Sequence, residues 1–361
     1  MSDVRYWLGF NLVPHIGPMR TRALMACFGD LETAWRADAA HLRAAGLPQN
    51  AIQELLYRRL SLDLEAELRK VEDLGLQLLT WESERYPALL KSIHQPPPLL
   101  YVDGQLTPED DWAVAVVGTR DPSPYGLRVA ERFAAGLAEN GVTVVSGLAL
   151  GIDGAAHRAS LAAGGRSLAV LGCGLDRVYP ARHRALASEI RRAGALLSDY
   201  PLGTEPAPAN FPPRNRIISG LSLGTLAVEA GERSGALITI HFALEQGRET
   251  FAVPGSIDSR KSVGTNTLLQ RGEAKPVMSV ADILEELNLS MVPQQRVVRQ
   301  VVPETPAEDA LLSHISAEPV HLDELVRRSG LETSVVSSTL TIMELKGLVR
   351  RVENMSYVLG Y

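Results

Sequence analysis

The stretch VTVVSGLALGIDGAAH, from Val142 to His157, joins a short β-rich run to a glycine-containing turn and the start of a helix. The run Val142–Val145 is compatible with a buried strand, and a helical pattern follows over Ile152–Ala163. Gly164 ends that pattern, because glycine takes a left-handed helix cap without strain. Strand, turn and helix in this order are the repeating unit of an α/β fold.

The same unit recurs along the middle of the chain. We predict strands over Ala113–Val117, Val142–Val145, Ser167–Leu171, Ala195–Leu197, Thr225–Val228 and Thr250–Val253. Between them we predict helices over Gly126–Asn140, Ile152–Ala163, Ala181–Ala193, Ile217–Leu221 and Ala236–Gln246. Apolar strands that alternate with helices indicate a mostly parallel sheet covered on both faces. Residues 81–289 are therefore predicted to form a doubly wound, Rossmann-like α/β domain.

Residues 1–80 have a helical pattern throughout. The turn at Leu12–Arg20 leads into a short amphipathic helix, and a weaker copy follows at Ala45–Pro48. Paired units of this kind are typical of a small helix-hairpin-helix or SAM-like domain, although a plain helical bundle with Gly and Pro as punctuation fits equally well. The segment has nine Lys and Arg against ten Asp and Glu, so we do not predict DNA contact here.

The C-terminal part of the chain is a separate module. Residues 290–307 form a polar, proline-punctuated stretch that we interpret as a linker. Residues 308–361 predict a winged-helix domain, with a helix-turn-helix between His321–Leu325 and Ser334–Lys346 and a β-ending tail. Such modules often bind duplex DNA. This one has five Lys and Arg against eight Asp and Glu, which favours a protein-contact or regulatory role.

Composition places the chain among ordinary soluble globular proteins. Hydrophobic residues make up 45% and charged residues 22%, and no apolar run approaches the length of a membrane span. The amino terminus lacks a secretion signal, and Cys27 and Cys173 form no CxxC pair, so we expect a reducing cytoplasm. The net charge of −6 argues against a generally basic nucleic-acid binder but leaves room for a local basic cleft.

A candidate site lies where the predicted strands end. In open α/β sheets, ligands bind beyond the carboxyl ends of the strands. The turns there contain small residues, hydroxyls and helix starts, as phosphate recognition requires. Between Gly174 and Gly220 there are seven arginines and no lysine, against four Asp and Glu. This local excess of guanidinium groups predicts a site for a ligand with more than one phosphate.

The segment NFPPRNRIISG, from Asn210 to Gly220, is the strongest part of that prediction. Its two prolines fix the backbone of a loop ahead of the helix expected at Ile217. Arg214 and Arg216 then present planar donors suited to phosphate, and Phe211 offers a face on which a base can stack.

Other chemistries find little support in the motifs. A P-loop and a GxGxxG turn are absent from the sequence, and His and carboxylate spacings do not resemble a metal site. We therefore expect neither a metal nor a cofactor. His157, on a helix of small residues, is interpreted as a structural hydrogen-bonding group. Glu229 at a strand end is interpreted as an acceptor for backbone amides rather than a general acid or base.

Six motifs taken together resemble the DNA processing protein A family (DprA, also called Smf). They are VVGTR at Val116–Arg120, SGLALGIDGAAH at Ser146–His157, LGCGLDRVYPARH at Leu171–His183, NFPPRNRIISGLS at Asn210–Ser222, and GERSGALIT at Gly231–Thr239 with VPGS at Val253–Ser256. The resemblance covers about residues 85–288. It implies a protein that binds single-stranded DNA, and duplex DNA more weakly, and that dimerises through its Rossmann domain. It further implies loading of a RecA-type recombinase during natural transformation, without enzymatic activity.

The resemblance also implies which residues surround the DNA backbone. They are Gly118, Thr119, Arg120, Ser146, Gly147, Gly151, Asn210, Phe211, Arg214, Asn215, Arg216, Ser234 and Gly235. Some family members have a lysine after the Tyr-Pro dipeptide, whereas this chain has Ala181, so Arg182 or Arg184 is expected to supply that charge. The dimer contact is expected at the helix that includes Leu268 and Leu269.

Two alternatives come from other functional classes. The lysine-decarboxylase-like (LOG) phosphoribohydrolases share the Rossmann subtype and use a PGGxGTxxE motif. Here Ser222–Glu229 (SLGTLAVE) lacks Pro-Gly-Gly and has one extra residue before the glutamate, which displaces the carboxylate that hydrolysis needs. A winged-helix transcription factor with a ligand-sensing Rossmann domain is the other alternative, and the acidic balance of residues 308–361 counts against it.

Overall fold

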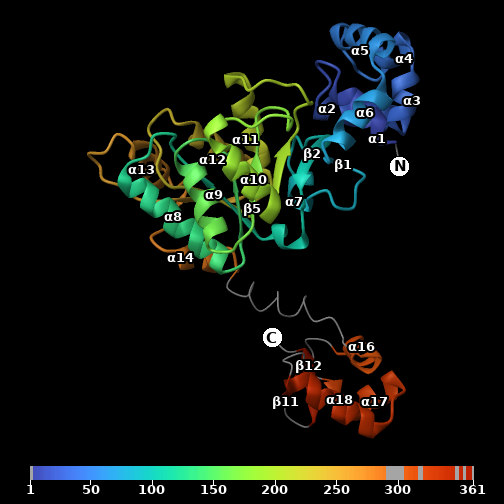
Figure 1. The fold of residues 1–361 in the computed structure, drawn as a ribbon, viewed down its shortest axis with the longest axis vertical. Helices are drawn as coiled ribbons and strands as arrows, with labels where there is room; N and C mark the ends of the chain where they lie inside the picture. The colour runs from blue at the N-terminus through green and yellow to red at the C-terminus, as the bar shows by residue number, and fades with distance from the viewer. Residues whose placement is uncertain (1–2, 290–304, 316–319, 346–348, 353–354, 360–361) are drawn as a thin grey trace. The chain divides into compact units, whose positions relative to one another are not determined.

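The computed structural model describes residues 3–289, 305–315, 320–345, 349–352 and 355–359. The chain divides into two compact units, Met1–Leu289 and Ser290–Tyr361 (Figure 1). Most of the linker expected over 290–307, namely residues 290–304, lies outside the described residues. None of the helices within the described residues is long and apolar enough to span a bilayer.

Six helices form the N-terminal part of the first unit. They are α1 (Val4–Asn11), α2 (Pro18–Phe28), α3 (Leu31–Arg36), α4 (Ala39–Ala44), α5 (Gln49–Ser61) and α6 (Leu64–Asp73). The side chains of Asp30, Asp38 and Asp63 accept backbone N–H bonds at the starts of α3, α4 and α6. These caps satisfy amides that have no partner inside a helix, so the short helices have well-defined ends.

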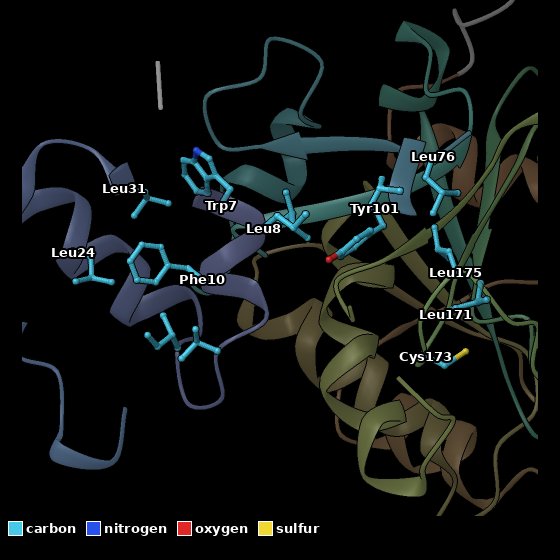
Figure 2. Close-up of a cluster of buried hydrophobic side chains, with 14 of the residues drawn as sticks. Trp7, Leu8, Phe10, Leu24, Leu31, Leu76, Tyr101, Leu171, Cys173 and Leu175 are labelled. Carbon is cyan, nitrogen blue, oxygen red and sulfur yellow. The ribbon is translucent and has the colours of Figure 1, made fainter. Parts of the chain in front are cut away.

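The core of these helices continues into the large sheet. Trp7 and Phe10 pack in one buried cluster with Leu24, and the same cluster reaches Tyr101 and Leu171 of the sheet region (Figure 2). A shared apolar core of this kind makes the helices and the sheet one packed body.

Nine strands form one sheet within the described residues of this unit, in the order β1-β2-β6-β5-β4-β3-β7-β8-β9. They are β1 (Gln77–Thr80), β2 (Leu99–Gly104), β3 (Ala113–Val117), β4 (Thr143–Ser146), β5 (Ser167–Val170), β6 (Ala195–Ser198), β7 (Gly224–Ala227), β8 (Glu249–Ala252) and β9 (Lys275–Pro276). From β6 to β9 all neighbours are parallel. All six predicted strands are present, and the doubly wound α/β fold is confirmed.

Helices cover both faces of this sheet. They are α7 (Ala88–Lys91), α8 (Pro124–Glu139), α9 (Ile152–Ala162), α10 (Arg184–Ala193), α11 (Phe211–Gly220), α12 (Gly235–Glu245), α13 (Val263–Gln270) and α14 (Val280–Glu286), with 3-10 turns η1 (Pro108–Asp111), η2 (Ala181–His183) and η3 (Pro208–Asn210). α9 packs against α8 and α10, while α11 packs against α7 and α12. Crossover connections between parallel strands are right-handed. The chain moves along the sheet in one direction from β3 to β6 and in the other from β7 to β8, so these two groups of helices lie on opposite faces.

Helix α11 and strands β1 and β2 differ from the sequence-based prediction. The helix expected to begin at Ile217 begins at Phe211, so Arg214 and Arg216 lie on α11 rather than in a loop. Pro212 and Pro213 fall in its first turn, where a missing N–H and a fixed φ are compatible with a helix. Strands β1 and β2 were also not predicted, and they pair antiparallel to each other and β2 to β6. β1 has four residues, too few for periodicity to distinguish a strand from the helical segment before it.

The second unit is the predicted winged helix. It contains α16 (Pro306–Leu312), β10 (Val320–His321), α17 (Leu322–Ser329), α18 (Thr333–Leu345), β11 (Val349–Val352) and β12 (Ser356–Leu359). The strands form an antiparallel sheet in the order β10-β12-β11. Leu311, Leu325, Val336 and Leu340 belong to a buried cluster of its own, so this unit has a separate core.

Candidate functional site

A cavity of about 620 Å³ opens at the carboxyl ends of the central strands. The chain runs from β3 through β4 and β5 to β6 on one side, and then crosses to β7 on the other side of β3. The turns after β3 and β7 diverge at this point, which is where open α/β sheets bind ligands. The cavity is lined from the turns after β3, β4, β5, β6 and β7, including Thr119, Arg120, Asp153, Tyr179, Pro206, Pro208, Phe211, Arg214, Asn215, Arg233, Ser234 and Gly235.

An aromatic stack with cations beside it forms one wall. The rings of Tyr179 and Phe211 are 5.7 Å apart and inclined by 25°. The guanidinium carbon of Arg120 lies 5.2 Å from the centre of the Phe211 ring, and that of Arg214 lies 5.9 Å from it. This wall combines flat apolar surface with positive charge, the two features that single-stranded nucleic acids bind.

Two of the three arginines in the cavity are exposed. Arg120 and Arg233 both face solvent, and no ion pair among the described residues includes either of them. Arg233 precedes Ser234, whose hydroxyl accepts the Ala236 N–H at 3.3 Å and caps α12. The amino terminus of this 11-residue helix adds a partial positive charge at the same edge. The accessible charge in the cavity is therefore positive, although the chain is acidic overall.

Arg214 has a different environment, because it is only 4% exposed. One terminal nitrogen donates to the carbonyl oxygens of Gly147, at 3.0 Å, and Val170. Its Nε donates to Asn215 Oδ1 at 3.2 Å. Burial lowers the pKa of this guanidinium to about 10, while the nearby Asp153 carboxylate acts in the opposite direction. Arg214 thus cross-links the ends of β4, β5 and α11.

Asp153 is the buried counterpart of Arg214. Its Oδ2 accepts the backbone N–H groups of Gly147 at 3.1 Å and Ala149 at 3.3 Å. Burial raises the pKa of this carboxyl, and the charge of Arg214 opposes that shift. A Cβ at Gly147 would lie 2.8 Å from Arg214 Nη2 and 2.9 Å from Asp153 Oδ2, so only glycine leaves room for both side chains.

The loop after β3 is held by backbone contacts and by Glu229. Thr119 N–H donates to the Glu229 carbonyl at 2.7 Å, and the Thr119 carbonyl accepts from Ile152 N–H at 3.2 Å. The buried Glu229 carboxylate accepts the Ser123 N–H and the Ser123 hydroxyl, each at 2.7 Å. Gly151, with a φ of +81°, has a missing Cβ that would lie 2.4 Å from the Thr119 carbonyl. These contacts fix the position from which Arg120 extends.

Eight of the residues expected at the DNA backbone line the cavity, and the others lie outside it. The eight are Gly118, Thr119, Arg120, Phe211, Arg214, Asn215, Ser234 and Gly235. Gly147 and Gly151 lie immediately behind the wall, as described above. Ser146 is fully buried, and its hydroxyl donates to the Val116 carbonyl at 2.7 Å.

The remaining expected contacts are directed elsewhere. Arg216 pairs with Asp199 at 2.7 Å and donates to the Gln95 carbonyl, on the side that meets the N-terminal helices. The Asn210 side chain donates to the Glu205 carbonyl at 3.2 Å. Arg182 and Arg184 are exposed on η2 and α10 but do not line the cavity.

Tyr179 and Arg233 are exposed lining residues that were not among the predicted contacts. Tyr179 comes from the turn after β5, and Arg233 from the turn after β7. Both lie within motifs that the sequence singled out, directly ahead of a helix start. Their position after parallel strands was the available signal, but the sequence does not indicate which side chains of such a turn face inward.

Other polar groups in the sheet region are structural. His157 is fully buried, and its Nδ1 lies 2.7 Å from the Ser167 hydroxyl oxygen. Burial lowers the pKa of His157 to about 3, so the ring is neutral near pH 7. No group of His, Cys, Asp and Glu side chains in the described part of the chain is arranged to hold a metal ion.

Models of known protein families match segments of both units. The model of the family described as DNA recombination-mediator protein A matches residues 77–288, and that of the DprA winged helix domain matches residues 298–355. Protein Smf of Synechocystis is 34% identical over 393 residues, covering 99% of this chain and 98% of its own length.

Two solved structures are also similar. The X-ray structure of DNA processing protein A from Streptococcus pneumoniae has a TM-score of 0.70 and 35% identity, covering 79% of this chain and 99% of the other. DNA processing protein A from Helicobacter pylori, whose structure is described in terms of its single-stranded DNA binding mode, has a TM-score of 0.53 and 30% identity. It covers 60% of this chain and 97% of the other.

Proposed function

This chain belongs to the DNA recombination-mediator protein A family, and from that premise we propose that its central cavity binds single-stranded DNA. The observation that carries the proposal is the Tyr179–Phe211 stack, 5.7 Å between rings, in one cavity with the exposed cations Arg120 and Arg233. Guanidinium groups suit the phosphates of the strand. Aromatic faces suit unpaired bases, which a duplex keeps stacked on one another.

The similarity to the Helicobacter pylori protein supports the same ligand. That protein is described by its single-stranded DNA binding mode, and it is 30% identical to this chain. We propose that Gly118, Thr119, Arg120, Asn215, Arg233, Ser234 and Gly235 meet the backbone of the strand. Arg214, Gly147 and Gly151 act by holding the walls in place. Only a DNA strand that extends beyond the cavity can contact Arg182, Arg184, Asn210 or Arg216.

The direct test is fluorescence anisotropy with labelled single-stranded and duplex DNA over a salt series. We expect tighter binding of the single strand and a linear fall of log K with log salt concentration, since phosphate neutralisation releases counterions. Equal affinity for both forms would contradict the proposal, and so would binding of neither. A nucleoside monophosphate added as competitor then distinguishes a strand site from a small nucleotide pocket.

The finer role that we propose is protection of incoming DNA and loading of a RecA-type recombinase during natural transformation. It rests on the family's description as a recombination mediator. The measurement is RecA filament formation on DNA already coated with a single-strand-binding protein, with wild type and Arg120→Ala. We expect acceleration by wild type only. Acceleration by both proteins would show that recombinase loading does not depend on DNA binding by Arg120 in the cavity.

We propose that the protein acts without catalysis. The carboxylate that a LOG-type hydrolase would need corresponds to Glu229, which already accepts two hydrogen bonds from Ser123 and does not line the cavity. The hydrolase alternative is therefore not favoured. Release of free base from nucleoside monophosphates by the wild-type protein, abolished by Glu229→Gln, would reverse this assignment.

A homodimer remains part of the proposal, with the contact near α13. Leu268 is 7% exposed and packs inside the chain with Ala227, Ile240 and Ala252, whereas Leu269 is half-buried beside that cluster. Leu269 is thus the better of the two positions for a contact with a second copy. Sedimentation of Leu269→Glu against wild type tests it, and an unchanged dimer would exclude this position.

A further inference from the structure

The ring of Phe211 has little free surface for a ligand. Tyr179 stacks on it, and the guanidinium groups of Arg120 and Arg214 lie 5.2 and 5.9 Å from its centre. A Cβ at Gly172 would lie 2.8 Å from Phe211 Cδ1, so the backbone there packs against the ring edge. Phe211 is accordingly only half-exposed at the start of α11. Phe211 therefore supports the ring that stacks on it and leaves a ligand little of its own surface.

Tyr179 has the opposite character within the same cavity. The residue is 46% exposed, although one region of its ring rests on Phe211. The phenol hydroxyl makes no hydrogen bond within the described residues, and Tyr179 belongs to none of the buried clusters that include sheet strands. Because the exposed Tyr179 ring is already held against Phe211, a ligand that stacks on it orders the side chain at little further cost in entropy. The cation Arg120 lies against the same Phe211 ring.

We infer that Tyr179 is the surface on which a nucleobase of the bound strand stacks, with Phe211 as its rigid backing. This inference rests on the proposed function and assigns the base contact to a residue different from the one that the sequence indicated. Stacking uses the face that every base has, so the subsite accepts any base. The cations Arg120 and Arg233, in the same cavity, contact the phosphates on either side of that base.

The experiment compares two ligands that differ only in their bases. One is a labelled oligothymidylate, and the other is an abasic oligonucleotide of equal length, which keeps the phosphates and sugars. The proteins are wild type, Tyr179→Ala, Tyr179→Phe and a matched control, Tyr57→Ala. Tyr57 is 67% exposed on α5 and lies outside the cavity. Thermal unfolding of each variant establishes that the fold is kept.

Tyr179→Ala is expected to weaken oligothymidylate binding about five- to hundredfold, the loss of one base–aromatic stack. Binding of the abasic strand should stay within about twofold of wild type, and the slope of log K against log salt should stay unchanged, because no phosphate contact is lost. Tyr179→Phe and Tyr57→Ala should bind both ligands as wild type does.

Two outcomes would overturn the inference while leaving the proposed function intact. One is wild-type affinity of Tyr179→Ala for oligothymidylate, and the other is an equal loss on both oligonucleotides, which would mean a backbone contact. Failure of the wild-type protein to bind either oligonucleotide would instead overturn the proposed function, and this inference with it.

Discussion

Arg120 and Arg214 carry the same charge at the same sheet edge, but their environments assign them different tasks. Arg120 is exposed and lies against Phe211 without a carboxylate partner among the described residues. Arg214 is buried, and its Nη1 already donates to the Gly147 and Val170 carbonyls and its Nε to Asn215 Oδ1. A group whose hydrogen bonds are already satisfied gains less from a phosphate than one that faces water. Substitutions at the two positions should therefore have different signatures.

Arg120→Ala is expected to weaken binding of all single strands similarly, because phosphate contacts carry no base information. The slope of log K against log salt should fall by about 0.7, the value for one phosphate contact on a single strand. Anisotropy titrations on strands of different sequence measure both effects. Arg85→Ala, at an exposed arginine outside the cavity, is the matched control and should leave the slope unchanged. A sequence-dependent loss would show that Arg120 reads bases.

Arg214→Ala is expected to act first on stability. Removing the guanidinium leaves buried carbonyl oxygens unpaired, at about 1–3 kcal/mol each, and leaves Asp153 without its positive neighbour. Urea denaturation should give a lower midpoint than that of wild type or Arg120→Ala. An unchanged midpoint together with a salt slope lower by about 0.7 would instead make Arg214 a direct phosphate contact.

At the scale of elements, helices α9, α11 and α12 line the cavity, and α9 and α11 carry its buried charged side chains, Asp153 and Arg214. α9 presents its first turns to the interior, with Ile152, Asp153 and His157 all buried. α11 begins at Phe211 and brings Arg214 back into the same interior. Both helices carry polar groups whose protonation depends on burial, so the stability of this region is coupled to pH.

His157 provides a test of that coupling. Its pKa is lowered to about 3, first by burial and then by the positive charges of His183, Arg158 and Arg214. The unfolded chain binds a proton near pH 6.5, whereas the folded chain does so only near pH 3. The free energy of unfolding should therefore fall as pH drops through this window, by at most about 1.4 kcal/mol per pH unit.

The measurement is urea denaturation of wild type and His157→Gln between pH 7.5 and 4.5. The variant should lose stability less steeply on acidification, whatever its stability at pH 7.5. Asp153 acts in the opposite direction, because burial raises the pKa of its carboxyl, but it is present in both proteins and cancels in the comparison. Parallel pH curves would show that His157 is accessible to protons in the folded state.

At the scale of the whole molecule, each of the two units has its own core, and the cavity belongs to the first. The cavity and its supporting contacts all come from residues of the first unit, whose core runs without interruption from α1 into the sheet. The winged helix has its own buried cluster around Leu311, Leu325 and Leu340. Each unit thus has the apolar core that independent folding requires.

A chain ending at Leu289 should therefore fold and keep the cavity. We expect its affinity for short single strands to be within about twofold of the full chain, with the same salt slope. Calorimetry of the full chain should show an additional transition that is missing from the shortened one, since the cores are separate. A large loss of affinity on truncation would mean that the winged helix contributes to the DNA contact, against the expectation from its acidic balance.

The sequence by itself determined the class and order of the elements. Each predicted strand from Ala113–Val117 to Thr250–Val253 appears within one residue of its expected bounds, because apolar runs and terminal glycines act locally. The winged helix was recognisable for the same reason, and the ordered motifs placed the chain in its family. Parallel strands bring the turns after them to one edge, so the location of the cavity also followed from the sequence.

Only the tertiary structure decided what each side chain does at that edge. That Arg214 is buried depends on carbonyl oxygens of β5 and the turn after β4, which are distant in sequence and approach only in the folded sheet. Tyr179 meets Phe211 across two different turns, so no local pattern indicates the stack. Burial and pairing between turns distinguish an arginine that meets the ligand from one that holds the wall. Neither is encoded in residue type or spacing, because both arise from contacts that form only when the sheet is assembled.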